Sequence, residues 1–101
     1  MKFVLDTNAV SEMAKPRPNQ GLVDWHLAQN AADLFVTTIT LAEVWEGFYS
    51  LDPKHREYDR IKRFASGLDK AYRVLNFDRR AAAVWGEMMR RGVVHITVLK
   101  S

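Results

Sequence analysis

The 101-residue chain contains no cysteine, only three prolines and five glycines, and no long hydrophobic run. Without cysteine it can form neither a disulfide framework nor a thiolate metal site, which is typical of small domains in a reducing compartment. The apolar stretch at the N-terminus stops at Asp6, too early for a signal peptide, and no segment approaches the roughly 18 apolar residues of a membrane span. These absences predict a cytoplasmic protein with no membrane segment.

Several motifs of common enzyme classes are also missing. No glycine-rich phosphate loop is present, which excludes a P-loop nucleotide hydrolase. Asn8 stands where an aspartyl-phosphate enzyme of the haloacid dehalogenase kind would need its second aspartate. The three histidines are scattered without the spacing of zinc ligands.

The composition that remains is that of a globular protein. Hydrophobic residues make up 48% of the chain and charged residues 27%, close to the average for one small domain or part of one. The net charge of +3 conceals a split between an acidic half, residues 1–52 at −4, and a basic half, residues 53–101 at +7. Such a split suits a metal site beside a surface that binds a polyanion, although it could equally arise by chance.

Apolar segments of two kinds alternate along the chain. Short apolar runs predict strands over residues 3–5, 34–37, 73–76 and 93–99, and helical periodicity predicts helices over 8–14, 21–30, 40–51, 54–72 and 78–92. Strands that alternate with helices indicate an α/β domain with a mainly parallel sheet.

Two of the helices carry clear apolar faces. The face of the helix over 40–51 contains Leu41, Val44, Trp45, Phe48 and Leu51, and that of the helix over 54–72 contains Tyr58, Ile61, Ala65, Leu68 and Tyr72. Thr40 and Glu43 match a capping box at the start of the first of them. The last helix has a similar face of Ala81, Val84, Trp85, Met88 and Met89, whose aromatic and methionine side chains we expect in the core or a subunit interface.

Two acidic side chains are expected to meet at one edge of the sheet. Asp6 ends the first predicted strand, and Glu43 lies in the first turn of the helix after the second strand. Ligands of such sheets bind beyond the carboxyl ends of the strands. Paired carboxylates suit Mg²⁺ or Mn²⁺, which can activate water and neutralise the charge of a phosphodiester. The alternative is that Asp6 only caps a turn and Glu43 only completes the capping box.

A basic stripe is predicted on the helix over 54–72. Four side chains share the side roughly opposite its apolar face: Arg56, Arg60, Arg63 and Lys70. A phosphate backbone would bind such a stripe with an affinity that falls as salt rises. The alternative is that the stripe is the solvated face of an amphipathic helix.

Three segments of the chain carry a resemblance to a known family. They are residues 3–12 with Asp6-Thr7-Asn8, residues 34–44 with Thr40-Leu41-Ala42-Glu43, and residues 74–78 before an alanine-rich helix. Their order and spacing resemble the PIN-domain ribonucleases, and within them the VapC- and FitB-type toxins of bacterial toxin–antitoxin pairs. The match runs from Met1 to about Gly92.

The resemblance implies a fold, an activity and partners. The fold would be a three-layer α/β/α sandwich, and the activity that of an Mg²⁺- or Mn²⁺-dependent endoribonuclease acting on RNA. The family forms homodimers and is neutralised by a cognate antitoxin protein. Asp6 and Glu43 match acids of the family's metal site and would be the catalytic residues, while Asn8 and Thr40 match polar positions that support them.

The chain departs from the family after Gly92. The family continues with an aspartate-containing segment, a further strand and another acidic stretch, whereas residues 93–101 contain no acid. We therefore expect an incomplete, C-terminally truncated PIN-like domain over residues 1–92 and a divergent tail over 93–101. The tail could supply an extra strand beside the first one.

These observations leave three hypotheses. The first is a metal-dependent endoribonuclease in which Asp6 and Glu43 hold the metal and the basic half holds RNA. The second is a catalytically inactive module that binds antitoxin or a sister subunit, which the missing acids favour. The third is an unrelated small α/β RNA-binding protein, which requires the match at Asp6 and Glu43 to be accidental.

Overall fold

The computed structural model describes residues 2–90 and 96–99, and its elements follow the order expected of an α/β domain. In chain order they are β1 (Lys2–Leu5), α1 (Thr7–Met13), α2 (Gln20–Leu27), a 3-10 turn (Ala31–Asp33), β2 (Leu34–Thr37), α3 (Thr38–Tyr49), α4 (Tyr58–Ala71), β3 (Arg73–Leu75), α5 (Arg79–Arg90) and β4 (Ile96–Leu99). Within these ranges no helix is long and apolar enough to cross a membrane.

The strands form one sheet in the order β3-β2-β1-β4. β1 pairs in parallel with β2, with Phe3 opposite Leu34, and β2 pairs in parallel with β3. β4 is antiparallel to β1, with Val98 opposite Phe3. The prediction of a mainly parallel sheet is confirmed, and β4 covers the edge of β1 that would otherwise expose unpaired backbone groups.

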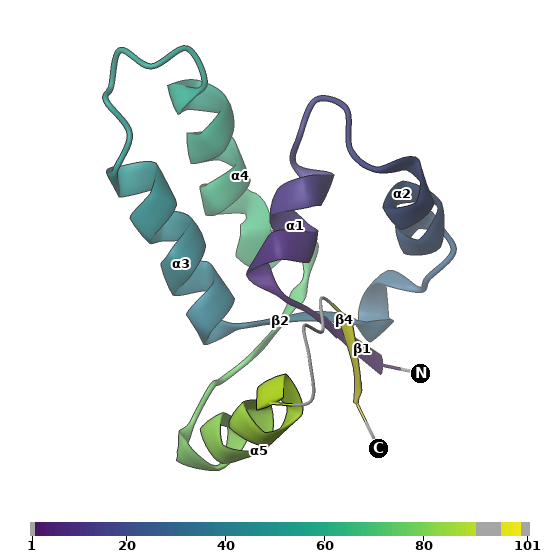
Figure 1. Ribbon diagram of the computed structural model, residues 1–101. Coiled ribbons are helices and arrows are strands. Elements are labelled where there is room, and N and C mark those ends of the chain that lie inside the picture. Colours follow the sequence, from purple (N-terminus) through teal and green to yellow (C-terminus); the bar gives the residue numbers. More distant parts are fainter. Residues whose placement is uncertain (1, 91–95, 100–101) are drawn as a thin grey trace.

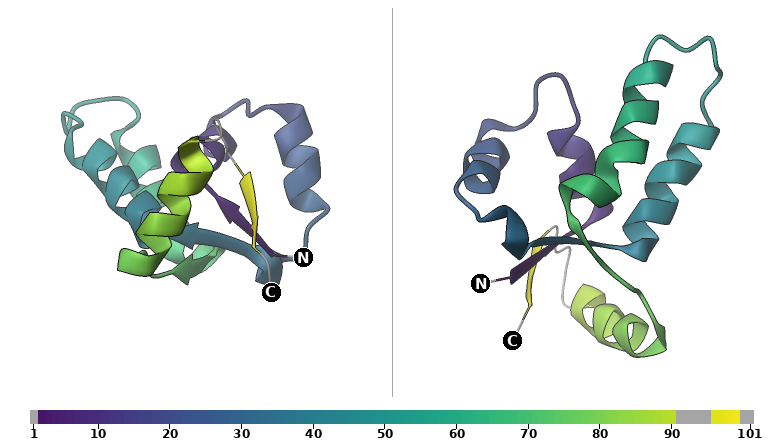
Figure 2. Two further views of the ribbon diagram at one scale, coloured as in Figure 1. Left: turned by 60° about the horizontal axis from the view of Figure 1, so that its bottom comes forward. Right: turned by 180° about the vertical axis from the view of Figure 1, so that it is seen from behind.

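Helices lie on both faces of the sheet. α1, α3 and α4 stand on one face with α2 beside them, and α5 lies on the opposite face, as the views in Figures 1 and 2 agree. This arrangement confirms the three-layer α/β/α sandwich. Because β1 and β2 are parallel neighbours, α1 and α3 both begin at the same edge of the sheet.

The core lies between the sheet and the layer of α1, α3 and α4. Its largest fully buried side chains are Leu5, Val10, Val36 and Leu68. The predicted apolar faces of α3 and α4 pack against this cluster, and the rings of Phe48 and Tyr58 join the two helices with centroids 4.9 Å apart. The periodicity of both helices is therefore confirmed by their packing.

The start of α3 differs from the prediction. The helix begins at Thr38, and its N-cap is Thr37, whose Oγ1 accepts a hydrogen bond from the Thr40 backbone N–H at 3.2 Å. The capping box of Thr40 and Glu43 is therefore wrong, because Thr37 ends β2 in an extended conformation and already supplies the cap.

The start of α4 also differs. The helix was predicted from about Lys54 but begins at Tyr58, so Arg56 lies in the preceding turn. The Asp52 side chain accepts from the Lys54 N–H at 2.8 Å, and its carbonyl accepts from the His55 N–H at 2.8 Å. These local bonds compete with helix formation, which explains the delay of one turn.

The last predicted elements agree with the structure where it describes them. Asp78 caps α5 by accepting from the Ala81 N–H at 2.9 Å. Val84 is 55% exposed although it belongs to the predicted apolar face of α5. The expected helix end at Gly92, the side chains of Met88 and Met89, and residues 93–95 of the predicted last strand lie outside the described residues.

A hydrogen bond between His26 and Tyr72 ties α2 to the end of α4. The His26 Nε2 and the Tyr72 hydroxyl oxygen are 2.9 Å apart, and burial lowers the pKa of His26 below its ordinary value of 6.5. His26 therefore binds a proton more tightly in the unfolded chain than in the folded chain, so the free energy of unfolding should fall as the pH drops below about 6.5.

Urea titrations between pH 5 and 8 test this expected pH dependence of the free energy of unfolding. His26→Gln should flatten the dependence and His55→Gln should retain it; equal slopes in both variants would contradict the assignment.

Candidate functional site

Asp6 stands at the junction of β1 and α1. Its Oδ1 accepts a hydrogen bond from the Ala9 backbone N–H at 2.8 Å, so it is the N-cap of α1. A carboxylate has two oxygens with several acceptor sites, and capping is compatible with a ligand role. The cap fixes the carboxylate at the carboxyl end of β1, where ligands bind in parallel sheets.

Glu43 lies in the second turn of α3, one turn later than expected, and its side chain is exposed. Because Thr37 supplies the cap, the structural explanation for Glu43 as part of a capping box no longer holds. α3 follows β2 directly and begins at the same edge of the sheet as α1 (Figure 1). Glu43 and Asp6 both line a pocket at this edge.

The structure brings the predicted site residues together in one pocket of about 190 Å³. Asp6, Asn8, Thr40 and Glu43 all line it. Thr40 is buried, and its Oγ1 accepts a hydrogen bond from the Thr7 hydroxyl at 3.2 Å. The acid that caps α1 and the acid in the second turn of α3 therefore share one hollow with two supporting polar side chains.

Sequence reasoning missed part of this pocket. Thr7 and the rings of Phe77 and Trp85 also line it, with the two ring centroids 6.1 Å apart. The Phe77 N–H donates to the Thr38 Oγ1 at 2.9 Å, which fastens the approach to α5 against the start of α3. The position of Trp85 on the apolar face of α5 indicated that its ring would be packed against other residues. The sequence alone could not show that α5 lies beside this pocket.

The donors in the pocket suit a hard divalent cation. Two carboxylates, an amide and hydroxyl groups offer oxygen ligands of the kind that Mg²⁺ and Mn²⁺ prefer. Over residues 2–90 and 96–99, no group of three or more histidine, cysteine, aspartate or glutamate side chains could hold a metal ion. Mg²⁺ commonly keeps several waters and needs only one or two carboxylates, so the residues present fit such an ion.

The basic candidates lie elsewhere. None of Arg56, Arg60, Arg63 and Lys70 lines the acidic pocket. Arg56, Arg63 and Lys70 are exposed, whereas Arg60 is half-buried and lines an adjoining groove. The four residues of the predicted stripe therefore do not form one surface. Three of them are exposed to solvent, whereas Arg60 contacts the end of α1.

The family model described as the PIN domain matches residues 3–97. The chain belongs to the PIN domain family. The match includes Asp6 and Glu43 and nearly the whole of the sheet.

Relatives of this PIN domain chain include a plasmid stability protein, a toxin and a ribonuclease. It is 33% identical to the plasmid stability protein StbB of Pseudomonas syringae pv. tomato, over 88% of this chain and 66% of that protein. It is 30% identical to toxin FitB of Neisseria gonorrhoeae, over 92% of this chain and 68% of that protein. It is 35% identical to ribonuclease VapC14 of Mycobacterium tuberculosis, over 79% of this chain and 77% of that protein. These similarities support a toxin of the VapC and FitB type.

A solved structure is similar in fold as well as sequence. FitAcB from Neisseria gonorrhoeae superposes with a TM-score of 0.68 at 28% identity, covering 86% of this chain and 64% of that chain. The chain therefore spans about two thirds of the length of StbB, FitB and the FitAcB chain.

Proposed function

We propose that this chain is a divalent-metal-dependent endoribonuclease of the PIN-domain toxin class. The observation that carries the proposal is the shared pocket of Asp6 and Glu43 at the carboxyl ends of two parallel strands. The ribonuclease name of VapC14 supports the reaction class, and the donor set supports Mg²⁺ or Mn²⁺ as the cofactor.

The pocket residues would act as ligands and supports. Asp6, fixed as the cap of α1, and Glu43, carried on the second turn of α3, would hold the cation. A bound divalent ion supplies an activated water and neutralises charge on the phosphodiester. Asn8 contributes an amide at the rim, and the hydrogen bond from Thr7 to Thr40 holds the floor in place. Phe77 and Trp85 shield one side from water.

The basic half of the chain would hold the RNA. Residues 53–101 carry a net charge of +7, and Arg56, Arg63 and Lys70 are exposed in the turn before α4 and along it. Cations that neutralise phosphates release counterions, so RNA binding would weaken as salt rises.

The proposed biological setting follows from the relatives. We propose that the protein acts in the cytoplasm, forms a homodimer and is neutralised by a cognate antitoxin. The toxin name of FitB and the similarity to the FitAcB structure support this setting.

A second candidate function is a catalytically inactive module that binds antitoxin or a sister subunit. The observation in its favour is that, among residues 2–90 and 96–99, the acidic pocket offers two carboxylates and no cluster of three acids or histidines. Fewer negative ligands weaken a divalent site. Metal binding therefore separates the two candidates.

The Glu43→Gln variant tests the proposed metal site. We expect the intact chain to bind one Mn²⁺ in isothermal titration calorimetry, and Glu43→Gln to weaken binding at least about tenfold, because the amide removes a charged ligand. Glu46→Gln is the matched control, since Glu46 is exposed on the same helix outside the pocket. No Mn²⁺ binding at millimolar concentration, or equal binding by Glu43→Gln, would favour the inactive module instead.

A further inference from the structure

A second groove adjoins the acidic pocket. It has a volume of about 230 Å³, runs between α1, α3 and α4, and shares the side chains of Thr7 and Glu43 with the pocket. Two cationic side chains line it, Lys15 after the end of α1 and Arg60 on α4. A hollow lined by two cations, with Glu43 at its junction with the pocket, therefore continues from the proposed metal site.

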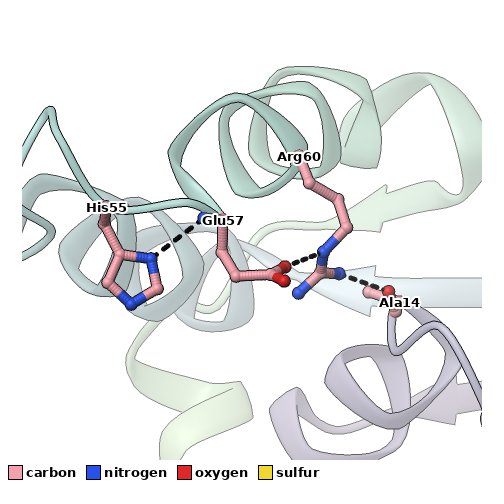
Figure 3. A network of polar contacts seen from close by, with 4 residues as sticks. All are labelled: Ala14, His55, Glu57 and Arg60. Carbon is pink, nitrogen blue, oxygen red and sulfur yellow. Dashed lines mark hydrogen bonds and ion pairs between the residues drawn. The ribbon is translucent and has the colours of Figure 1, made fainter.

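Arg60 is held in position by two neighbours. Its Nη1 donates to the Ala14 carbonyl oxygen at 2.5 Å, and its Nε donates to a Glu57 carboxylate oxygen (Figure 3). The ion pair with Arg60 lowers the pKa of Glu57. A guanidinium has five N–H donors, so these contacts orient the group across the gap from α4 to α1 and leave donors for an anion.

Lys15 is held less firmly on the other side of the groove. Its Nζ lies 3.0 Å from the Glu12 Oε1, the side chain is 60% exposed, and the contact lowers the pKa of Glu12. An exposed ion pair of this kind contributes little energy and can exchange for a phosphate oxygen. Lys15 and Arg60 line the groove, whereas their ion-pair partners Glu12 and Glu57 do not.

On the side of α3, the groove is lined by Gly47, which has no side chain. Gly47 lies inside α3, where glycine costs about 1 kcal/mol relative to alanine. A Cβ built at this position would meet nothing within 4 Å, so helix packing does not require the glycine. Gly47 lines the groove together with Lys15 and Arg60, and it fills none of that space with a side chain.

We propose that this groove binds a backbone phosphate of single-stranded RNA next to the phosphate that lies at Asp6 and Glu43. Lys15 and Arg60 are positioning residues, which fix the strand so that the scissile phosphate reaches the acidic pocket. The groove suits one phosphate group, because two cationic residues and Ser11 line a hollow of limited volume. The proposal rests on the proposed ribonuclease function and names the substrate contact of the same site.

RNA binding without metal tests the groove separately from cleavage. Fluorescence anisotropy with a labelled single-stranded RNA in EDTA should show Lys15→Gln binding three- to tenfold more weakly than the unmodified chain. The slope of log K against log salt should fall by about 0.7, the value for one lost phosphate contact on a single strand. Lys2→Gln is the matched control, because Lys2 is exposed at the start of β1, at the opposite end of that strand from Asp6, and lies outside both the groove and the basic half. We expect it to bind RNA as the unmodified chain does.

Gly47→Leu supplies a second variant. Leucine favours the helix and projects into the groove, so the protein should fold while RNA binding weakens. The groove assignment is overturned if the unmodified chain fails to bind RNA, if Lys15→Gln binds RNA as well as Lys2→Gln does, or if Gly47→Leu binds RNA as well as the unmodified chain does. If binding depends on Lys15 but the unmodified chain does not cleave RNA with Mn²⁺, the phosphate site stands and the proposed catalysis fails.

Discussion

Asp6→Asn is expected to lower metal-dependent RNA cleavage at least about 100-fold while leaving the protein folded. The asparagine amide is neutral, so it removes one of the two carboxylates that would hold the cation. Loss of groups that only support metal ligands already costs 10- to 100-fold, and loss of a ligand itself should cost more. Cleavage of an end-labelled single-stranded RNA measures the rate.

The same variant controls for folding. Asparagine is as good an N-cap as aspartate, so the bond from the Ala9 N–H can be kept and the free energy of unfolding should change by less than about 0.5 kcal/mol. Asp69→Asn makes the same chemical change at an exposed position on α4 and should cleave normally. Full cleavage by Asp6→Asn would remove Asp6 from the catalytic site.

Leu5→Ala is expected to lower the free energy of unfolding by about 2–5 kcal/mol. Leu5 is 0% exposed and belongs to the central cluster between the sheet and its helices. A small domain has only about 5–15 kcal/mol of total stability, so the loss should leave a substantial unfolded fraction on warming. Because only the folded chain brings Asp6 and Glu43 into one pocket, RNA cleavage should fall with the folded fraction.

Leu27→Ala is the matched control for this change. Leu27 is 76% exposed at the end of α2, so the same substitution should change stability by less than about 0.5 kcal/mol. Urea unfolding followed by circular dichroism compares the two variants. A loss below 1 kcal/mol for Leu5→Ala would contradict the position of β1 at the centre of the core.

The sequence was enough to predict the parts of the fold that local patterns determine. The strand over 34–37 was predicted with the observed bounds, because four consecutive apolar or β-branched residues are buried on both faces. The apolar periodicity of α3 and α4 predicted the sides that pack into the core. The meeting of Asp6 and Glu43 followed from the parallel order of β1 and β2, which places both loops at one edge.

The remaining features depend on contacts between distant residues. Thr37 and Thr40 offer the same chemistry for a cap, and only the end of β2 decides that Thr37 is used. An apolar helix face would carry Trp85 both if its ring packed in the core and if it lined the pocket. The position of α5 on its face of the sheet decides that Trp85 lines the pocket. The contact from Arg60 to Ala14 spans 46 residues, which no helical pattern can predict.

Cleavage of end-labelled single-stranded RNA by the purified chain, in Mg²⁺ or Mn²⁺ and in EDTA, tests the central claim most directly. We predict internal cuts with either cation, no cuts in EDTA, and restoration when the cation is returned in excess. RNA that stays intact with both cations, while the chain is folded and binds the oligonucleotide, would contradict the assignment of this PIN domain chain as an active endoribonuclease.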